Sequence, residues 1–268
     1  MSKRSVIVIF LFALICFVSW STSQNTSQPT SQDESQTTSS YDYRHPLLAK
    51  VPTDISEKIF KHTAYTCSYN SDKRNPNYVA WTLTKERVKG KVKRTDTFFE
   101  DPELTDNEKA RLEDYRGSGY QRGHMCPAGD NKWDKIAMIE SFYLSNVCPQ
   151  TGSLNGGDWK ELEESCRELV NHTNDTLHII CGPIYDTSPK RIGGRVAVPE
   201  QFFKVILRFN GATQQGIGFI YNNTKANHPM QYYVRSIDEV EKITGFDLFN
   251  TLPRKLQKKL ESQKELFF

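Results

Sequence analysis

The chain has 268 residues, and its 35 Lys and Arg against 32 Asp and Glu give a formal net charge of +3. This balance excludes an overwhelming polyanion-binding field, although a local basic cleft could still steer nucleic acid. Without the two amino-terminal segments described next, about 220 residues remain, which suits one hydrophobic core.

Residues 1–21 have the pattern of a secretory signal peptide. Lys3 and Arg4 precede an apolar run, 6–18, and small polar residues follow it. The run is shorter than the roughly twenty residues that a membrane span needs. We therefore predict a secreted or periplasmic protein that has no stable membrane association after signal cleavage. The oligomeric state cannot be read from the sequence.

Residues 22–44 are dominated by Ser, Thr, Gln and Asn. This composition buries too little apolar surface to offset the loss of chain entropy on folding, so we predict a disordered linker. Residues 45–268 are then expected to form a single domain.

The body of the chain alternates strand and helix patterns. Five segments rich in β-branched and aromatic residues predict strands: 63–69, 78–84, 177–181, 202–209 and 216–221. Apolar residues at helical spacing predict a helix over 159–170, Ser236 and Glu239 form a capping box, and 254–268 is expected to be a terminal helix. This mixture favours an α+β layer structure over a regular βαβ alternation.

Five cysteines lie beyond the predicted signal peptide: Cys67, Cys126, Cys148, Cys166 and Cys181. In the oxidising compartment that a signal peptide implies, we expect two disulfides and a free Cys67. The spacing does not fix the connectivity.

The segment 119–128 reads Gly-Tyr-Gln-Arg-Gly-His-Met-Cys-Pro-Ala. Hydrolysis of a phosphodiester needs a proton acceptor and neutralisation of the phosphoryl charge. His124 can accept a proton near neutral pH, and Arg122 offers a permanent planar charge. The two side chains share a face if the segment is a strand, but not necessarily if it is a turn. A lone histidine is more often structural.

Asn155 and Glu163 follow about thirty residues later, around Leu-Asn-Gly-Gly-Asp-Trp. The amide oxygen of Asn155 can bind magnesium, or the residue can simply cap a helix that begins near Gly157. On one continuous helix Glu163 would be rotated by about 80° from Asn155, so both could point toward one site. Taken alone, Glu163 would be a solvated helix charge.

A basic run precedes the histidine segment: Lys85, Arg87, Lys89, Lys91, Lys93 and Arg94. Such a run can contact phosphates without reading bases, or it can be an ordinary solvated loop.

These motifs together resemble the DNA/RNA non-specific endonuclease family. The resemblance is carried by Gln-Arg-Gly-His, by Leu-Ser-Asn-Val-Cys-Pro-Gln at 144–150 and by Leu-Asn-Gly-Gly-Asp-Trp followed by Glu163, and it extends from about Tyr65 to Phe249. It implies an α+β fold, with a mostly antiparallel central sheet flanked by helices and a ββα-metal motif at the active site.

The resemblance also implies roles for particular residues. His124 would be the general base, Asn155 would bind Mg²⁺ (with Mn²⁺ or another divalent cation as a substitute), and Glu163 would order the water shell of the metal. Asn146 would support the histidine or the site geometry.

In addition to Arg122, an arginine upstream in the sequence is expected to stabilise the transition state. Arg94 is the best match, Arg87 and Arg74 compete with it, and an exposed surface charge is the alternative for Arg94. The chain departs from the family at Gln121, where members commonly have Asp, which bears on rate or pH optimum more than on reaction class.

The resulting prediction is a magnesium-dependent endonuclease that hydrolyses DNA and RNA with little sequence specificity and leaves 5′-phosphate ends. The alternatives are a catalytically silent nucleic-acid-binding or surface module with the same fold, and a structural zinc site. The zinc site would use His124, Cys126, Cys148 and Cys166, whose spacing lacks paired close ligands.

Overall fold

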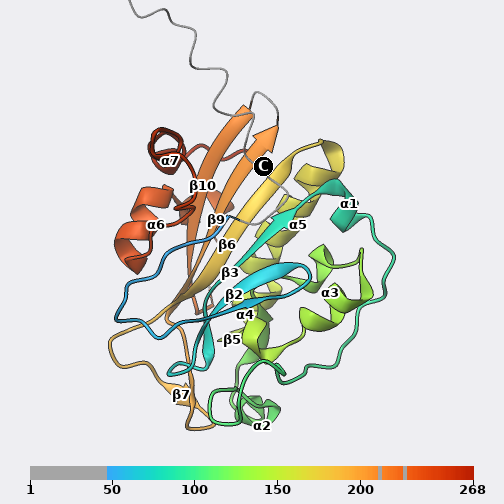
Figure 1. The fold of residues 1–268 in the computed structure, drawn as a ribbon, viewed down its shortest axis with the longest axis vertical. Coiled ribbons are helices and arrows are strands. Elements are labelled where there is room, and N and C mark those ends of the chain that lie inside the picture. Colours follow the sequence, from blue (N-terminus) through green and yellow to red (C-terminus); the bar gives the residue numbers. More distant parts are fainter. Residues whose placement is uncertain (1–46, 211–212, 226–227) are drawn as a thin grey trace, which may run out of the picture. The chain divides into compact units, whose positions relative to one another are not determined.

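The computed structural model describes residues 47–210, 213–225 and 228–268, and its centre is a seven-stranded sheet (Figure 1). The strand order is β1-β2-β3-β6-β9-β10-β11, and every neighbouring pair is antiparallel. The bounds are β1 Lys58–Lys61, β2 Tyr65–Asn70, β3 Asn75–Leu83, β6 Thr176–Ile184, β9 Gln201–Asn210, β10 Thr213–Asn222 and β11 Val234–Arg235. The predicted antiparallel sheet and all five predicted strands are confirmed.

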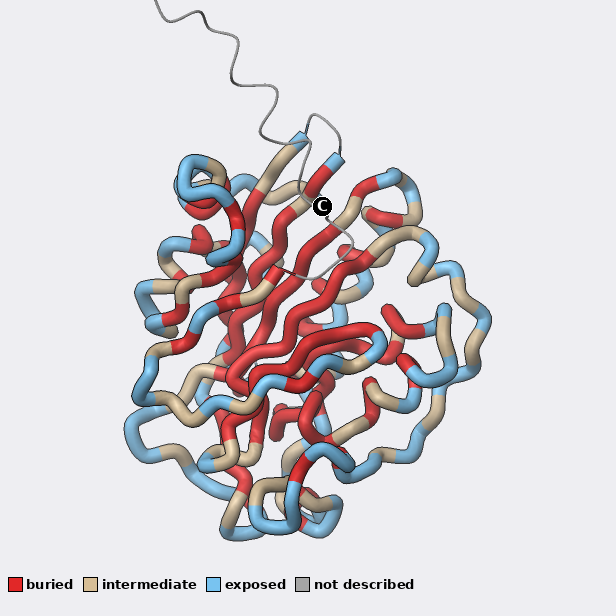
Figure 2. The backbone as a smooth tube through the Cα atoms, in the orientation of Figure 1, coloured by how far each residue is buried: buried red, intermediate tan, exposed pale blue. Residues whose placement is uncertain are grey.

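The register of the central strands explains their sequences. Ile179 lies opposite Ile206, which in turn lies opposite Ile217, so β-branched residues form a row across β6, β9 and β10. Such cross-strand pairs stabilise a sheet through side-chain packing. Figure 2 shows these strands as the buried centre of the molecule.

Helix α5 (Asp158–His172) covers one face of this sheet. Its Trp159, Leu162, Cys166 and Val170 are buried at helical spacing, as predicted. The ring of Trp159 lies 5.7 Å from that of Phe202 on β9. The helix is therefore fixed to the sheet by an apolar stripe, while its polar side remains available.

Helices α6 (Ile237–Thr244) and α7 (Arg254–Glu261) cover the opposite face. The predicted capping box of Ser236 and Glu239 begins α6. Two glycines of β10 let these helices approach closely, because a Cβ at Gly216 would lie 2.4 Å from the carbonyl oxygen of Leu260 and one at Gly218 would lie 2.9 Å from Val240. Helix α7 ends at Glu261, short of the predicted end at 268.

Two antiparallel strands and two helices form the ββα part of the fold. Strands β4 (Gln121–His124) and β5 (Val147–Gln150) pair antiparallel, and α4 (Gly152–Gly156) leads from β5 into α5. The remaining elements are α1 Lys85–Val88, α2 Leu112–Tyr115, α3 Lys135–Glu140, β7 Arg191–Ile192, β8 Val196–Ala197, and single 3₁₀ turns at Ala128–Asp130, Leu144–Asn146 and Met230–Tyr233.

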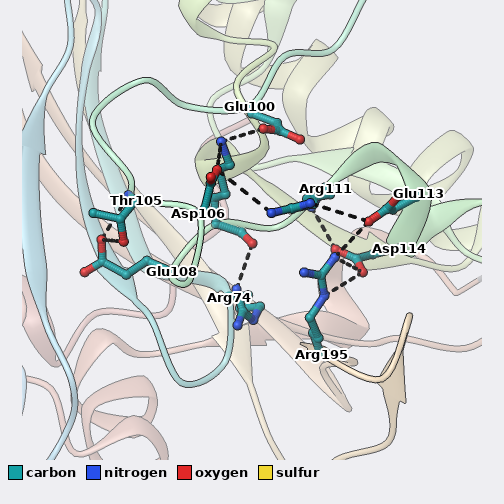
Figure 3. A network of polar contacts seen from close by, with 10 residues as sticks. Arg74, Glu100, Thr105, Asp106, Glu108, Arg111, Glu113, Asp114 and Arg195 are labelled. Atoms are coloured by element: carbon teal, nitrogen blue, oxygen red, sulfur yellow. Dashed lines mark hydrogen bonds and ion pairs between the residues drawn. The ribbon is translucent and has the colours of Figure 1, made fainter.

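A polar network holds the loop around α2 against the rest of the domain (Figure 3). Lys109 Nζ lies 2.7 Å from carboxylate oxygens of both Glu100 and Asp106. Arg195 binds Asp114 through Nε and Nη2, at 3.1 and 2.8 Å. This network matters for the site because the same loop supplies one wall of the cleft described below.

The disulfide prediction is wrong. Cys67, Cys126, Cys148, Cys166 and Cys181 are all free and buried in the structure. The thiols of Cys67 and Cys181 each donate to a backbone carbonyl, of Ser145 and Met125, at 3.4 Å. The cysteines therefore act as small core residues, which is a common role for a free buried thiol.

The predicted signal peptide, 1–21, and linker, 22–44, lie outside the described residues, so the domain boundary at 45 stays a prediction. Across the part of the chain that the structure describes, none of the helices has the length and apolar character to cross a membrane.

Candidate active site

A cleft of about 890 Å³ opens beside the ββα part of the fold. Five of the six predicted site residues line it: Arg94, Arg122, His124, Asn155 and Glu163. The sixth, Asn146, is completely buried. Residues as far apart in the sequence as Arg94 and Glu163 thus meet at one surface, which the sequence motifs alone could not show.

Arg122 and His124 share a face of β4, so the strand alternative is confirmed. Both contact the ring of Phe98, at 4.5 Å for the guanidinium and 5.1 Å for the imidazole. At Gly123, between them, a Cβ would lie 1.9 Å from Oε1 of Gln150 on the paired strand, so any larger residue would displace the Gln150 side chain.

The His124 imidazole packs against two aromatic rings that also contact each other. Phe98 and Phe142 lie 5.1 and 4.8 Å from it, and the residue is only 9% exposed. Burial first, and then the charges of Arg94 and Arg122, lower the pKa of His124 to about 3. Its Nε2 has no hydrogen-bond partner among the described residues. The ring is therefore neutral at ordinary pH and can accept a proton.

Asn146 fixes the backbone that follows the histidine. Its Oδ1 accepts from the Cys126 N–H at 2.9 Å, and its Nδ2 donates to the carbonyls of Cys126 and Ser141 at 2.9 and 2.8 Å. These bonds satisfy backbone groups within the core. Asn146 lies under the site and supports its geometry without lining the cleft.

Asn155 lies in α4 and is not the cap of α5, which is Gly157. The helix breaks at Gly157, so the assumption of one continuous helix through Asn155 and Glu163 is wrong, although both residues reach the same cleft. Asn155 Nδ2 donates to Oε1 of Gln121 at 2.8 Å. Because this bond uses the amide nitrogen, it orients Oδ1 as the atom that can bind a hard cation.

Glu163 is held inside the cleft and is not a solvated helix charge. Its side chain is 13% exposed, and its carboxylate oxygens lie 3.9 Å from Lys204 Nζ and 4.0 Å from Arg167 Nη1. Burial raises the pKa of Glu163 to about 7, and the two cations only partly offset this effect.

The three candidates for the upstream arginine occupy different places. Arg94 lines the cleft, with its guanidinium 5.1 Å from the centre of the Phe142 ring. Arg87 instead donates to the Thr82 carbonyl at 2.6 Å, and Arg74 donates to the Lys109 carbonyl at 2.8 Å in the network of Figure 3. Neither of these two lines the cleft.

Sequence reasoning missed Arg167 and Lys204. Arg167 Nη1 lies 3.0 Å from Asp130 and also lines the cleft. Lys204 is 1% exposed, and its ammonium lies 4.0 Å from the centre of the Trp159 ring. Two signals were available: Arg167 is four positions after Glu163, and Lys204 interrupts the apolar run from Phe202 to Leu207.

The donor set of the cleft fits a hard divalent cation, since Asn155 offers an amide oxygen and Glu163 a carboxylate. The zinc alternative is wrong. Among the described residues, only Asp238, Glu241 and Glu261 bring three ligand atoms of His, Cys, Asp or Glu within 4.8 Å of one another.

Three nucleases illustrate the similarity of the chain to known proteins. It is 34% identical over 243 residues to the mitochondrial nuclease EXOG of Xenopus laevis, covering 80% of this chain and 68% of the relative. It is 32% identical over 234 residues to mitochondrial Nuclease 1 of Schizosaccharomyces pombe, with coverage of 80% and 72%. Mitochondrial endonuclease G of Bos taurus is 30% identical over 213 residues, with coverage of 74% and 71%.

These relatives correct the predicted location. They are named as mitochondrial nucleases, so the expectation of a secreted or periplasmic protein is wrong. The error came from treating the apolar run within 1–21 as a secretory signal. The disulfide prediction depended on the same step, because it assumed an oxidising compartment.

The fold and the sequence pattern agree on one family. The crystal structure of an EndoG/EndoGI complex matches with a TM-score of 0.71 at 27% identity, covering 78% of this chain and 92% of that chain. The sequence pattern of DNA/RNA non-specific endonucleases matches residues 47–255. The chain therefore belongs to the DNA/RNA non-specific endonuclease family, and it is a metal-dependent nuclease with the ββα-metal fold.

Proposed function

We propose that this protein is a Mg²⁺-dependent endonuclease that cuts DNA and RNA with little sequence preference, using the cleft around His124. One observation carries the proposal: a neutral buried imidazole, a cation-binding amide, a carboxylate and two arginines line the same cleft. These are the groups that phosphodiester hydrolysis requires.

His124 accepts the proton of the attacking water. The water oxygen forms a bond to phosphorus, and the bond from phosphorus to the 3′-oxygen breaks. The departing oxygen takes a proton from a solvent water, so the products are a 5′-phosphate and a 3′-hydroxyl. Phe98 and Phe142 pack against the ring and hold its orientation. The proton acceptor is thus already positioned before substrate binds.

Arg94 and Arg122 neutralise the phosphoryl oxygens. In the free protein their charges help to lower the pKa of His124. A bound phosphodiester would compensate those charges and make the imidazole a stronger base. Substrate binding would therefore activate His124, which links base strength to the presence of the phosphate.

Asn155 would hold the cation through Oδ1, and Glu163 would orient its waters. When bound, Mg²⁺ supplies positive charge for the departing 3′-oxygen, and Mn²⁺ or another divalent cation could replace it. Gln121 positions Asn155 by the 2.8 Å hydrogen bond. Asn146 acts through the backbone after His124 and is a positioning residue.

Low sequence preference follows from the charge of the cleft. Besides Arg94 and Arg122, three cationic residues line it: Arg116, Lys160 and Arg167. Contacts from such residues to phosphates position nucleic acid without reading bases. Lys89, Lys91 and Lys93 are exposed on the segment that leads to Arg94, so we assign them to further contacts with the phosphates of the nucleic acid.

The relatives support a mitochondrial location, where DNA and RNA are both present as substrates. Import of the full chain fused to a fluorescent protein would test the location, and exclusion of the fusion from mitochondria would contradict it.

We also assign residues 45–268 to a single nuclease domain.

Activity is tested by incubating the full chain with supercoiled plasmid and with RNA, in Mg²⁺ or in EDTA, beside His124→Ala. We expect metal-dependent cutting of both substrates and a loss of about 10²- to 10⁴-fold in the variant. If the folded parent binds nucleic acid but cuts neither substrate with any of several divalent cations, the silent binding module is correct and the proposal fails.

A further inference from the structure

A second group of acidic residues lies on the opposite face of the sheet from the cleft, between α6 and α7. Asp238 and Glu241 belong to α6, and Glu261 is the last residue of α7. One carboxylate oxygen from each lies within 4.8 Å of the others. Like charges at this separation repel one another unless a proton or a cation lies between them.

The packing of the two helices fixes this group. The carbonyl of Leu260, beside Glu261, would lie 2.4 Å from a Cβ at Gly216, so α7 sits directly against β10. Val240, beside Glu241, makes the corresponding close approach at Gly218. The backbones that carry these carboxylates are therefore held close together against the sheet.

Glu261 is the unexpected member, because it is only 7% exposed. Within the part of the chain that the structure describes, its Oε1 is buried and has no hydrogen-bond partner. A buried carboxylate oxygen without a partner is costly, so such a group is expected to have one. Asp238 is exposed and leaves the group open to solvent on one side.

The surrounding charges increase the need for a cation. Glu241 uses one oxygen to accept from the Leu248 N–H at 2.7 Å. Burial first, and then Glu241, Asp238 and Asp247, raise the pKa of Glu261 to about 8, with Arg254 acting in the opposite direction. Burial and the acidic neighbours thus disfavour an ionised Glu261 that has no cation beside it.

We propose that Asp238, Glu241 and Glu261 form a second metal site, selective for Ca²⁺, that clamps α7 onto α6. Calcium accepts six to eight oxygen ligands in flexible geometry, so three carboxylates and waters entering beside Asp238 suit it. Magnesium more often uses one or two carboxylates together with substrate phosphates, as in the cleft. This site would stabilise the carboxyl-terminal helix and take no part in cleavage.

The test uses the full chain with Asn155→Ala, which removes the cation ligand of the cleft, after treatment with EDTA and dialysis. Calcium chloride is titrated by calorimetry, and thermal unfolding is followed in parallel. We expect one equivalent of Ca²⁺ per chain and a rise in Tm of about 5 °C at a hundredfold excess over Kd. Magnesium chloride should bind at least tenfold more weakly.

Adding Glu261→Gln should abolish the calcium response, and adding Asp238→Asn should weaken binding at least tenfold. Glu265→Gln, at an exposed residue four positions after Glu261 in the sequence, is the matched control and should bind as the parent does. Asp238 is exposed, so its variant is expected to fold and tests the calcium site even if Glu261→Gln fails to fold. No calcium binding up to about 1 mM, unchanged binding in the Asp238 variant, or tighter magnesium than calcium would overturn the proposal.

Discussion

Two buried glutamates on opposite faces of the same sheet have opposite surroundings. Glu163 in the cleft lies within 4.0 Å of Arg167 and Lys204, whereas Glu261 lies among carboxylates. Burial raises the pKa of both side chains, to about 7 and about 8. The contrast shows that burial alone does not determine the role of a carboxylate. Cationic neighbours suit Glu163 for a site that binds phosphate, and acidic neighbours suit Glu261 for a cation.

The largest expected effect within the cleft, apart from loss of His124, is that of Asn155→Ala. Removal of the amide oxygen that holds the cation should lower kcat by about 10³-fold. Plasmid cleavage at saturating Mg²⁺ measures this, with Ser153→Ala, an exposed residue of the same short helix, as the control. Activity within tenfold of the parent would remove Asn155 from the metal site.

Glu163→Gln should change how stability depends on pH in EDTA. The pKa of Glu163 is raised from its ordinary 4.5 to about 7 in the folded protein. The folded state therefore holds this proton more tightly than the unfolded state, and stability falls as pH rises from 4.5 through 7. The variant has no carboxyl group to titrate at this position. Its advantage over the parent in free energy of unfolding should therefore grow by about 3 kcal/mol between pH 4 and pH 8.

Urea unfolding of both proteins across that pH range measures the difference. Other titrating groups are common to the two proteins and cancel in the comparison. An advantage that does not vary with pH would show that Lys204 and Arg167 keep Glu163 ionised throughout.

Gln121→Ala should act through the metal requirement. Without the bond to Asn155 Nδ2, the amide is free to rotate, and the Mg²⁺ concentration for half-maximal activity should rise about 10- to 100-fold. At saturating Mg²⁺, kcat should recover, which a general loss of structure would not allow. Gln121→Asp should restore the metal requirement, because a carboxylate can accept the same hydrogen bond. A fall in kcat that excess metal cannot correct would contradict a positioning role.

The smallest effect is expected in the solvated network of Figure 3. Glu100, whose side chain is 39% exposed, lies 2.7 Å from Lys109 Nζ. Exposed ion pairs contribute little because water screens them, so Glu100→Gln should lower stability by less than about 1 kcal/mol. A larger loss in urea unfolding would mean that this network, and not the packed core, fixes the wall of the cleft.

Much of the fold could be predicted because its signals are local. The β-branched and aromatic content of β9 and the apolar spacing of α5 are patterns that a short stretch of sequence shows. The capping box at Ser236 is likewise a short-range pattern. The break at Gly157 was missed, since Asn155 and Glu163 lie at a spacing that also fits one continuous helix.

The site was predicted in part, for a similar reason. His124, Asn155 and Glu163 belong to short motifs, but Lys204 and Arg167 gain their meaning only from the packing of β9 against α5. The disulfide prediction for the five cysteines failed for a different reason. Their pairing was inferred from an assumed compartment, whereas their burial in the core is a property of the fold.

One measurement separates the role of the proton acceptor from that of the metal-binding residue. Single-turnover cleavage is measured on a duplex in which one scissile 3′-oxygen is replaced by sulfur, a leaving group that needs little stabilisation. We expect Asn155→Ala to recover most of its lost rate on this substrate, while His124→Ala stays as slow relative to the parent as on the ordinary duplex. Recovery by His124→Ala would instead place the histidine at the leaving group, and His124 would then not be the base that acts on the attacking water.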